Sequence, residues 1–159
     1  MICLSTTEPE RKQPMTPKEY LYRIRNLKLE VEATKNELLE LKASMAGVRA
    51  IDTTKDHVDG GKPVDMSDVM DRIEAVKEKL TRQLSEMMTE RDKAREIIDS
   101  MPESKWVSYY RYVLKERYLL GKSWEMIAVD MSYGYRNVLY LHGKALQEFG
   151  KTFHRFSHS

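Results

Sequence analysis

The sequence predicts an all-α protein in which a long N-terminal helical hairpin or coiled coil is followed by a small domain of three helices. Two observations support this fold class. Glycine and proline are scarce, with seven and five residues, and most of them lie outside the periodic stretches. Charged residues make up 33% of the chain and hydrophobic residues 41%, which is typical of amphipathic helices that bury one stripe of side chains.

The first long helix is expected from Pro17 onward, after a flexible polar leader over residues 1–16. Thr16 is suited to cap this helix and Pro17 to begin it, because the N–H that proline lacks would be unpaired there. Apolar side chains then recur at alternating spacings of four and three, with Thr34 in the single gap, at Tyr20, Ile24, Leu27, Val31, Leu38, Leu41 and Met45. This heptad pattern predicts packing against another helix, and Gly47 is expected to end the pattern.

A second long helix is predicted after a loop near residues 48–65. Asp65 or Ser67 can cap its N-terminus. Its apolar residues are Val69, Met70, Ile73, Val76, Leu80, Leu84, Met87, Ala94, Ile97, Ile98 and Met101. Pro102 marks its end, because a residue that precedes proline avoids the helical region.

The two predicted long helices have similar lengths, roughly 45 and 50 Å at about 1.5 Å per residue. Similar lengths favour an antiparallel hairpin over residues 17–101 that turns at Gly60 and Gly61. A parallel homodimer would bury the same stripes equally well. The sequence therefore predicts helix pairing, with a homo-oligomer formed through the N-terminal helices as the open alternative.

Residues 102–150 are predicted to form a helix-turn-helix domain of three helices, with a polar tail over residues 151–159. The first helix is expected over about residues 104–120, and Gly121 ends it. Ser123 can cap the second helix, and a turn that includes Gly134 leads to the third. Both tryptophans and seven of the nine tyrosines follow Pro102, so aromatic burial is expected to stabilise this small domain.

Gly121, Lys122 and Ser123 match the end of a phosphate-binding loop, which raises the alternative of a nucleotide site. Such a loop needs a glycine five residues before Gly121, so that successive backbone N–H groups can wrap the phosphates. That position is Glu116, whose carboxylate would repel the ligand, and no predicted strand leads into the stretch. The nucleotide alternative is therefore rejected.

The third predicted helix has two chemically different faces. Val138, Leu141, Ala145 and Phe149 share an apolar face, and Arg136, Tyr140, Gly143, Lys144 and Gln147 lie opposite. The opposite face has the donors needed to contact bases in a major groove and to hold phosphates. The predicted contacts to double-stranded DNA are Lys122, Ser123, Tyr135, Arg136, Asn137, Tyr140, Lys144 and Gln147.

Formal charge is unevenly placed along the chain. Residues 102–159 hold nine Lys or Arg and five Asp or Glu, a net charge of +4, whereas residues 1–101 carry −2. A basic C-terminal part modestly favours a polyanionic partner there.

The stretch "ERYLLGKSWEMIAVDMSYGYRNVLYLHGKAL" resembles region 4 of bacterial sigma factors, which reads the −35 promoter element. The family pattern of x-E-x-I-A, a turn, an arginine followed shortly by valine or isoleucine, and A-L is matched by residues 124–128, 136–138 and 145–146. More closely, the stretch is similar to RinA- or ArpU-type transcriptional regulators of phages and prophages of Gram-positive bacteria. That resemblance is specific over residues 113–149, and family members often have serine where Gly134 stands.

The resemblance implies a transcription regulator that activates phage late genes at a promoter and contacts RNA polymerase. Two alternatives from other classes stay open, a small terminase-like DNA-packaging recognition subunit and a helical adaptor that binds a host protein. The cytoplasm of the bacterial host cell is the expected location. Cys3 cannot form an internal disulfide, and no apolar run approaches the roughly 18 residues that span a bilayer.

No catalytic residues, metal site or cofactor site are predicted, and the protein is not expected to be an enzyme. No nucleophile, base and orienting group occur together in a recognisable pattern. His154 and His158 are four residues apart, but no carboxylate or cysteine accompanies them. His142 is expected to pack beside Phe149, to bond a carbonyl group or to meet phosphate.

Overall fold

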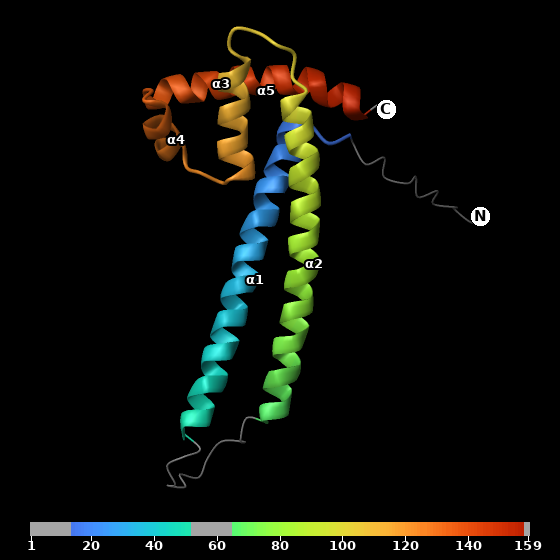
Figure 1. Cartoon of the computed structure of the whole chain (residues 1–159), viewed down its shortest axis with the longest axis vertical. Helices are drawn as coiled ribbons and strands as arrows, with labels where there is room; N and C mark the ends of the chain where they lie inside the picture. The colour runs from blue at the N-terminus through green and yellow to red at the C-terminus, as the bar shows by residue number, and fades with distance from the viewer. Residues whose placement is uncertain (1–13, 52–64, 158–159) are drawn as a thin grey trace, which may run out of the picture.

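The computed structural model describes residues 14–51 and 65–157, and every regular element in these ranges is a helix. The elements are α1 (Pro17–Ile51), α2 (Met66–Asp99), α3 (Val107–Leu114), the π-helical turn η1 (Lys115–Leu119), α4 (Trp124–Met131) and α5 (Tyr135–Ser157). Figure 1 shows α1 and α2 side by side as a long stalk, with the other helices gathered at one end as a head. The predicted all-α class is confirmed. The predictions for residues 1–13, 52–64 and 158–159 lie outside the described residues.

The start of α1 agrees with the expected cap. The N–H of Glu19 donates to Oγ1 of Thr16 at 3.2 Å, and the N–H of Thr16 donates to Oε2 of Glu19 at 2.8 Å. This reciprocal pair satisfies two backbone donors that the helix start would otherwise leave unpaired. Asp65 caps α2 in a similar way, because its carboxylate accepts the N–H of Ser67 at 3.0 Å.

The predicted end of the first helix at Gly47 is wrong, since α1 continues to Ile51. A glycine ends a helix by adopting the left-handed conformation, and Gly121 is the only described glycine with a positive φ. Within a helix, glycine costs only about 1 kcal/mol relative to alanine. A helix of 35 residues tolerates that cost.

The stalk is an antiparallel pair within one chain. Leu21 and Ile24 of α1 pack in one cluster with Ile97 and Ile98 near the end of α2. Further along the stalk, a second cluster joins Leu27, Val31 and Met87. Exposed ion pairs between the helices, such as Arg23 with Glu86 at 3.4 Å, each contribute at most about 1 kcal/mol. The apolar seam therefore stabilises the pair.

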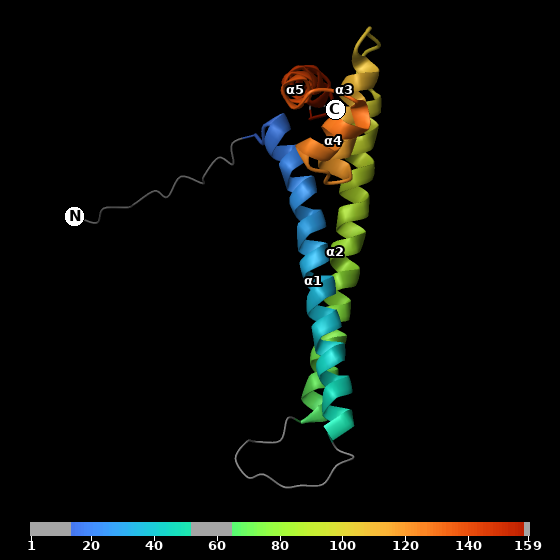
Figure 2. The same ribbon diagram turned by 90° about the vertical axis from the view of Figure 1, so that its left-hand side faces the viewer.

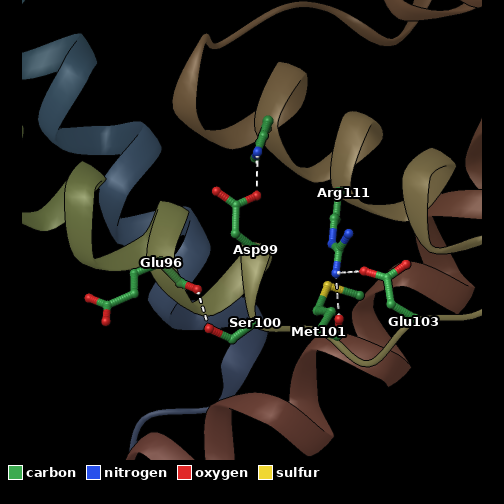
Figure 3. Close-up of polar contacts among 7 residues, drawn as sticks. Glu96, Asp99, Ser100, Met101, Glu103 and Arg111 are labelled. Carbon is green, nitrogen blue, oxygen red and sulfur yellow. Dashed lines mark hydrogen bonds and ion pairs between the residues drawn. The ribbon is translucent and has the colours of Figure 1, made fainter.

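Polar contacts hold the chain where it passes from the stalk to the head (Figure 3). Arg111 of α3 donates from Nη2 to the carbonyl oxygen of Met101 at 2.6 Å and to Oε1 of Glu103 at 2.8 Å. Lys115 pairs with Asp99 at the end of α2. Because Met101 is itself buried, these contacts fix α3 against the stalk.

The single helix predicted over residues 104–120 is α3 followed by the π-helical turn η1. The wider turn is closed by the N–H of Leu120, which donates to the carbonyl of Lys115 at 3.0 Å. A π turn adds one residue to a helical turn and so shifts the register of the side chains that follow. In η1 two successive residues, Tyr118 and Leu119, are both buried. Gly121 then ends the turn with φ 74°, as expected.

The connection between α4 and α5 is a tight turn. Ser132 adopts the left-handed conformation with φ 54°, and the N–H of Tyr133 donates to the carbonyl of Ala128 at 2.9 Å. This pattern is a Schellman end, in which glycine is commoner than serine. The carbonyl of Gly134 accepts the N–H groups of Asn137 and Val138, so Gly134 caps α5.

The tail expected over residues 151–159 is instead helical to Ser157. Thr152 is buried, and the ring of Phe153 lies 5.0 Å from that of Tyr20 on α1. This burial gives the last turns of α5 a packing energy that the polar sequence did not suggest. As a result α5 lies crosswise over the end of the stalk, and Figure 2 shows it nearly end on.

No helix in residues 14–51 and 65–157 has both the length and the apolar character needed to cross a membrane.

Two glycine substitutions test these backbone assignments. Gly121→Ala should destabilise the fold by about 1–2 kcal/mol, because a Cβ disfavours the left-handed conformation. The added Cβ would also meet the side chain of Lys28 at 3.4 Å. Gly47→Ala is the matched control, since its Cβ would meet nothing within 4 Å. It should stabilise the fold by about 0.5–1 kcal/mol. Urea denaturation measures the change in the free energy of unfolding for both variants. Equal changes in the two variants would contradict the assignments.

Candidate nucleic-acid interface

The first half of α5 presents a polar face to solvent, formed by Arg136, Tyr140, Gly143, Lys144 and Gln147. All five residues are exposed, and Tyr140 is 67% exposed. Tyr135 and Asn137, which were also predicted to contact DNA, are exposed beside this face. The structure therefore places six of the eight predicted contact residues on the exposed surface of one helix.

The opposite side of α5 is buried, which fixes the direction of the polar face. Val138 and Leu141 pack with Val113 of α3 and with Ile127 and Ala128 of α4. Ala145 and Phe149, one and two turns further on, join the core cluster shared with the stalk. α5 cannot rotate about its axis without exposing these four apolar side chains, so the polar face is held outward.

The polar face has positive charge that no carboxylate neutralises among the described residues. Arg136 and Lys144 form no ion pair there, and the ammonium group of Lys144 lies 5.7 Å from the centre of the Tyr140 ring. A cation–π contact orients the ammonium group but leaves its charge in place. Lys151 differs, because it pairs with Glu148 at 2.8 Å. The free positive charge is thus concentrated in the first half of α5.

Gly143 has no packing role that the structure explains. It lies in the interior of α5, and a Cβ at this position would meet nothing within 4 Å. Glycine there costs about 1 kcal/mol of stability relative to alanine. The result is a patch of bare backbone in the middle of the polar face.

The two predicted contacts before α4 have other partners. Oγ of Ser123 accepts the N–H of Met126 at 3.3 Å and caps α4, which leaves the hydroxyl hydrogen able to donate. Lys122 pairs with Glu116 and, at 2.8 Å, with Asp130. Hydrogen bonds to Asp130 and Glu116 raise the pKa of Lys122 above its ordinary value. Lys122 therefore joins η1 to α4, and its charge is neutralised within the fold.

Sequence patterns missed an aromatic and cationic network beneath α5. Oη of Tyr118 lies 2.8 Å from Nε2 of His142, and the His142 and Trp124 rings meet edge to face at 4.6 Å. The guanidinium of Arg117 lies over the indole of Trp124, 4.3 Å from the ring centre. These residues come from three different elements, so no local spacing in the sequence could have revealed their contact.

His142 is a structural residue in this network. Burial, together with the positive charges of Lys18 and Arg117, lowers the pKa of His142 to about 4. At neutral pH the ring is therefore uncharged, and Nε2 can accept the hydroxyl hydrogen of Tyr118. Of the three roles expected for His142, contact with phosphate is the least compatible with this arrangement.

Within the described ranges, no three His, Cys, Asp or Glu side chains lie together as a possible metal site. His154 lies on α5, where its ring contacts Phe153, and His158 is outside the described residues.

Comparisons with known proteins identify no relative of this chain. No protein-family model, no curated protein and no solved structure matches this chain.

The buried state of His142 predicts a pH-dependent stability. Its pKa in the folded protein, about 4, is below the ordinary value of 6.5, so the unfolded chain binds more protons between these values. The stabilisation is complete above about pH 7 and decreases as the pH falls toward 4. His142→Gln keeps an acceptor for Tyr118 but cannot titrate there. The free energy of unfolding should therefore depend less on pH in this variant between pH 7 and 5, and identical slopes would contradict the assignment.

Proposed function

We propose that this protein is a sequence-specific, double-stranded-DNA-binding transcription regulator, with α5 as the helix that enters the major groove. The observation that carries the proposal is the polar face of α5. It is exposed, it has unpaired positive charge among the described residues, and the buried face behind it fixes its direction. An α-helix of this kind fits the major groove, which is about 12 Å wide.

The chemistry of the face divides its residues between two tasks. Arg136 can donate two hydrogen bonds to a guanine edge, and Gln147 can pair with an adenine edge. Tyr140, which is 67% exposed, can donate to a base or to the backbone. Lys144 suits a phosphate contact, because an ammonium group acts as a point charge without preferred geometry.

The turn before α5 is consistent with the proposed docking. The Schellman end at Ser132 and the cap at Gly134 bring α4 and α5 together without a long loop. α4 then packs against α5 through Ile127 and Ala128, as the first helix of a helix-turn-helix does. The hydroxyl of Ser123 at the start of α4 is a further candidate for a phosphate contact.

The biological setting is proposed on the resemblance to sigma factor region 4 and to the phage regulators. It is that of an activator of phage late genes, acting at a promoter in the cytoplasm of the bacterial host with RNA polymerase as a further partner. The stalk is proposed to present the head, and a homo-oligomer through the N-terminal helices would need surfaces other than the seam that α1 and α2 bury against each other.

The sequences of the DNA fragments that the protein binds test the proposed function directly. Full-length protein, mixed with sheared genomic fragments and recovered by pull-down, should enrich fragments that share one sequence upstream of a gene. Enrichment of a single packaging-type site, with a ring of eight or more subunits in light scattering, would favour the terminase-like alternative. Retention of a host protein but no DNA at low salt would favour the adaptor.

Alanine substitutions on the polar face should separate specific from general contacts. Arg136→Ala and Tyr140→Ala should each weaken binding to the recovered site by about 1–3 kcal/mol, with less effect on random duplex. Lys144→Ala should weaken both duplexes similarly and reduce the slope of log affinity against log salt by about 0.9. Arg82→Ala, an exposed charge on α2, is the control and should change neither. Fluorescence anisotropy at several salt concentrations measures duplex binding by all four variants. If the three α5 variants bind both duplexes as Arg82→Ala does, α5 is not part of the interface.

Gly143→Ala tests the bare backbone separately. The variant should gain about 1 kcal/mol of stability, because alanine favours the helix. If a nucleic-acid backbone approaches α5 closely, the same methyl group should weaken duplex binding. Thermal denaturation and anisotropy on the same sample distinguish the two effects, and a more stable variant that binds as tightly as the original would contradict close approach at this position.

A further inference from the structure

A group of cations lies on the part of α1 that meets the head. Lys18, Arg25 and Lys28 lie near one side of the helix, since their spacings of seven and three residues are close to whole turns. Lys28 donates from Nζ to the carbonyl oxygen of Leu120, just after η1. This side of the stalk therefore faces η1.

Ring contacts connect this side of α1 to α5. The ammonium group of Lys18 lies 5.8 Å from the centre of the Tyr22 ring, and that ring meets Tyr118 edge to face at 5.5 Å. Tyr118 in turn bonds to His142 of α5 at 2.8 Å. The cations of α1 are thus packed against the same network that lies beneath the polar face.

These cations have no carboxylate partner among the described residues, and Arg25 acts on a further cation, Arg117 of η1. Burial, and next the positive charge of Arg25, lower the pKa of Arg117, while Glu125 is the one carboxylate that acts in the opposite direction. Within the described residues, Lys18, Arg25 and Lys28 form no ion pair, whereas Arg23 on the other side of α1 pairs with Glu86. Gathered like charges destabilise a fold, and an anionic ligand would relieve that repulsion.

The position of this cluster matches a flank of the polar face. The network holds His142, which directly precedes Gly143 in α5. Among the residues of the polar face, Gly143 lies nearest to the side of α5 that carries His142. When a helix occupies a major groove, the phosphate backbones that border the groove pass along both of its flanks. One of these backbones would pass beside α1.

We propose that Lys18 and Arg25 contact the phosphate backbone that borders the occupied major groove, so that the stalk itself is part of the DNA interface. The inference rests on the proposed function of α5 and extends it to a second element. Arg25 is half-buried, and its planar guanidinium suits the two-pronged geometry of a phosphate group. Such contacts set the angle of the stalk on DNA and do not depend on base sequence.

The test uses full-length protein, a duplex with the recovered site and a random duplex of equal length, titrated at several KCl concentrations. Lys18→Gln and Arg25→Gln should each reduce the slope of log affinity against log salt by about 0.9 on both duplexes. Arg25→Lys keeps the charge and should retain most of the slope. Lys42→Gln removes a charge from an exposed site further along α1, and its slope should equal that of the unchanged protein. Circular dichroism and melting curves verify that each variant is folded.

The outcomes separate this inference from the proposed function. If the unchanged protein binds the site but Lys18→Gln and Arg25→Gln behave like Lys42→Gln, the stalk is not in the interface and the inference is wrong. The function of α5 would then stand. If the unchanged protein binds neither duplex at low salt, the proposed function fails and the inference fails with it.

Discussion

Burial of Tyr118 and Phe149, where the stalk meets the head, is the constraint on which the rest of the structure depends. Both rings are fully buried in one cluster with residues from α1, α2 and α3. Aromatic side chains bury a large area each, so a small head gains much of its stability from this single junction. The head also has a smaller cluster of its own, in which Val138 and Leu141 of α5 pack with residues of α3 and α4. The orientation of α5 is therefore set jointly by both parts.

This shared core explains why a helix of 23 residues is needed in the head. The first half of α5 packs on α3 and α4 and presents the polar face, while the second half packs on the ends of α1 and α2 through Phe149 and Phe153. One rigid element thus joins the proposed DNA contacts to the stalk. In the proposed function, a partner bound along the stalk would be held at a defined position relative to the DNA.

The sequence predicted the features that depend on local chemistry. Thr16, Asp65 and Ser123 cap helices as expected, Gly121 ends η1, and the two faces of α5 follow from its periodicity. Features that depend on tertiary packing could not be predicted in this way. The π turn at Tyr118, the helical continuation past Thr152 and the ion pairs of Lys122 arise from contacts between distant segments. For the proposed site, periodicity identified the face of α5, but the cations of α1 were recognisable only once the structure placed them beside the head.

Photo-cross-linking from the polar face tests the central claim most directly. Benzoyl-phenylalanine in place of Tyr140 should cross-link to bound duplex DNA, whereas the same group in place of Leu39, which is similarly exposed at 64% on the distal part of α1, should not. Both variants keep the core intact, so their binding affinities can be compared before irradiation. Cross-links from position 140 alone would support α5 as the DNA-reading helix. Duplex binding without cross-links from position 140, or equal cross-linking from both positions, would contradict it.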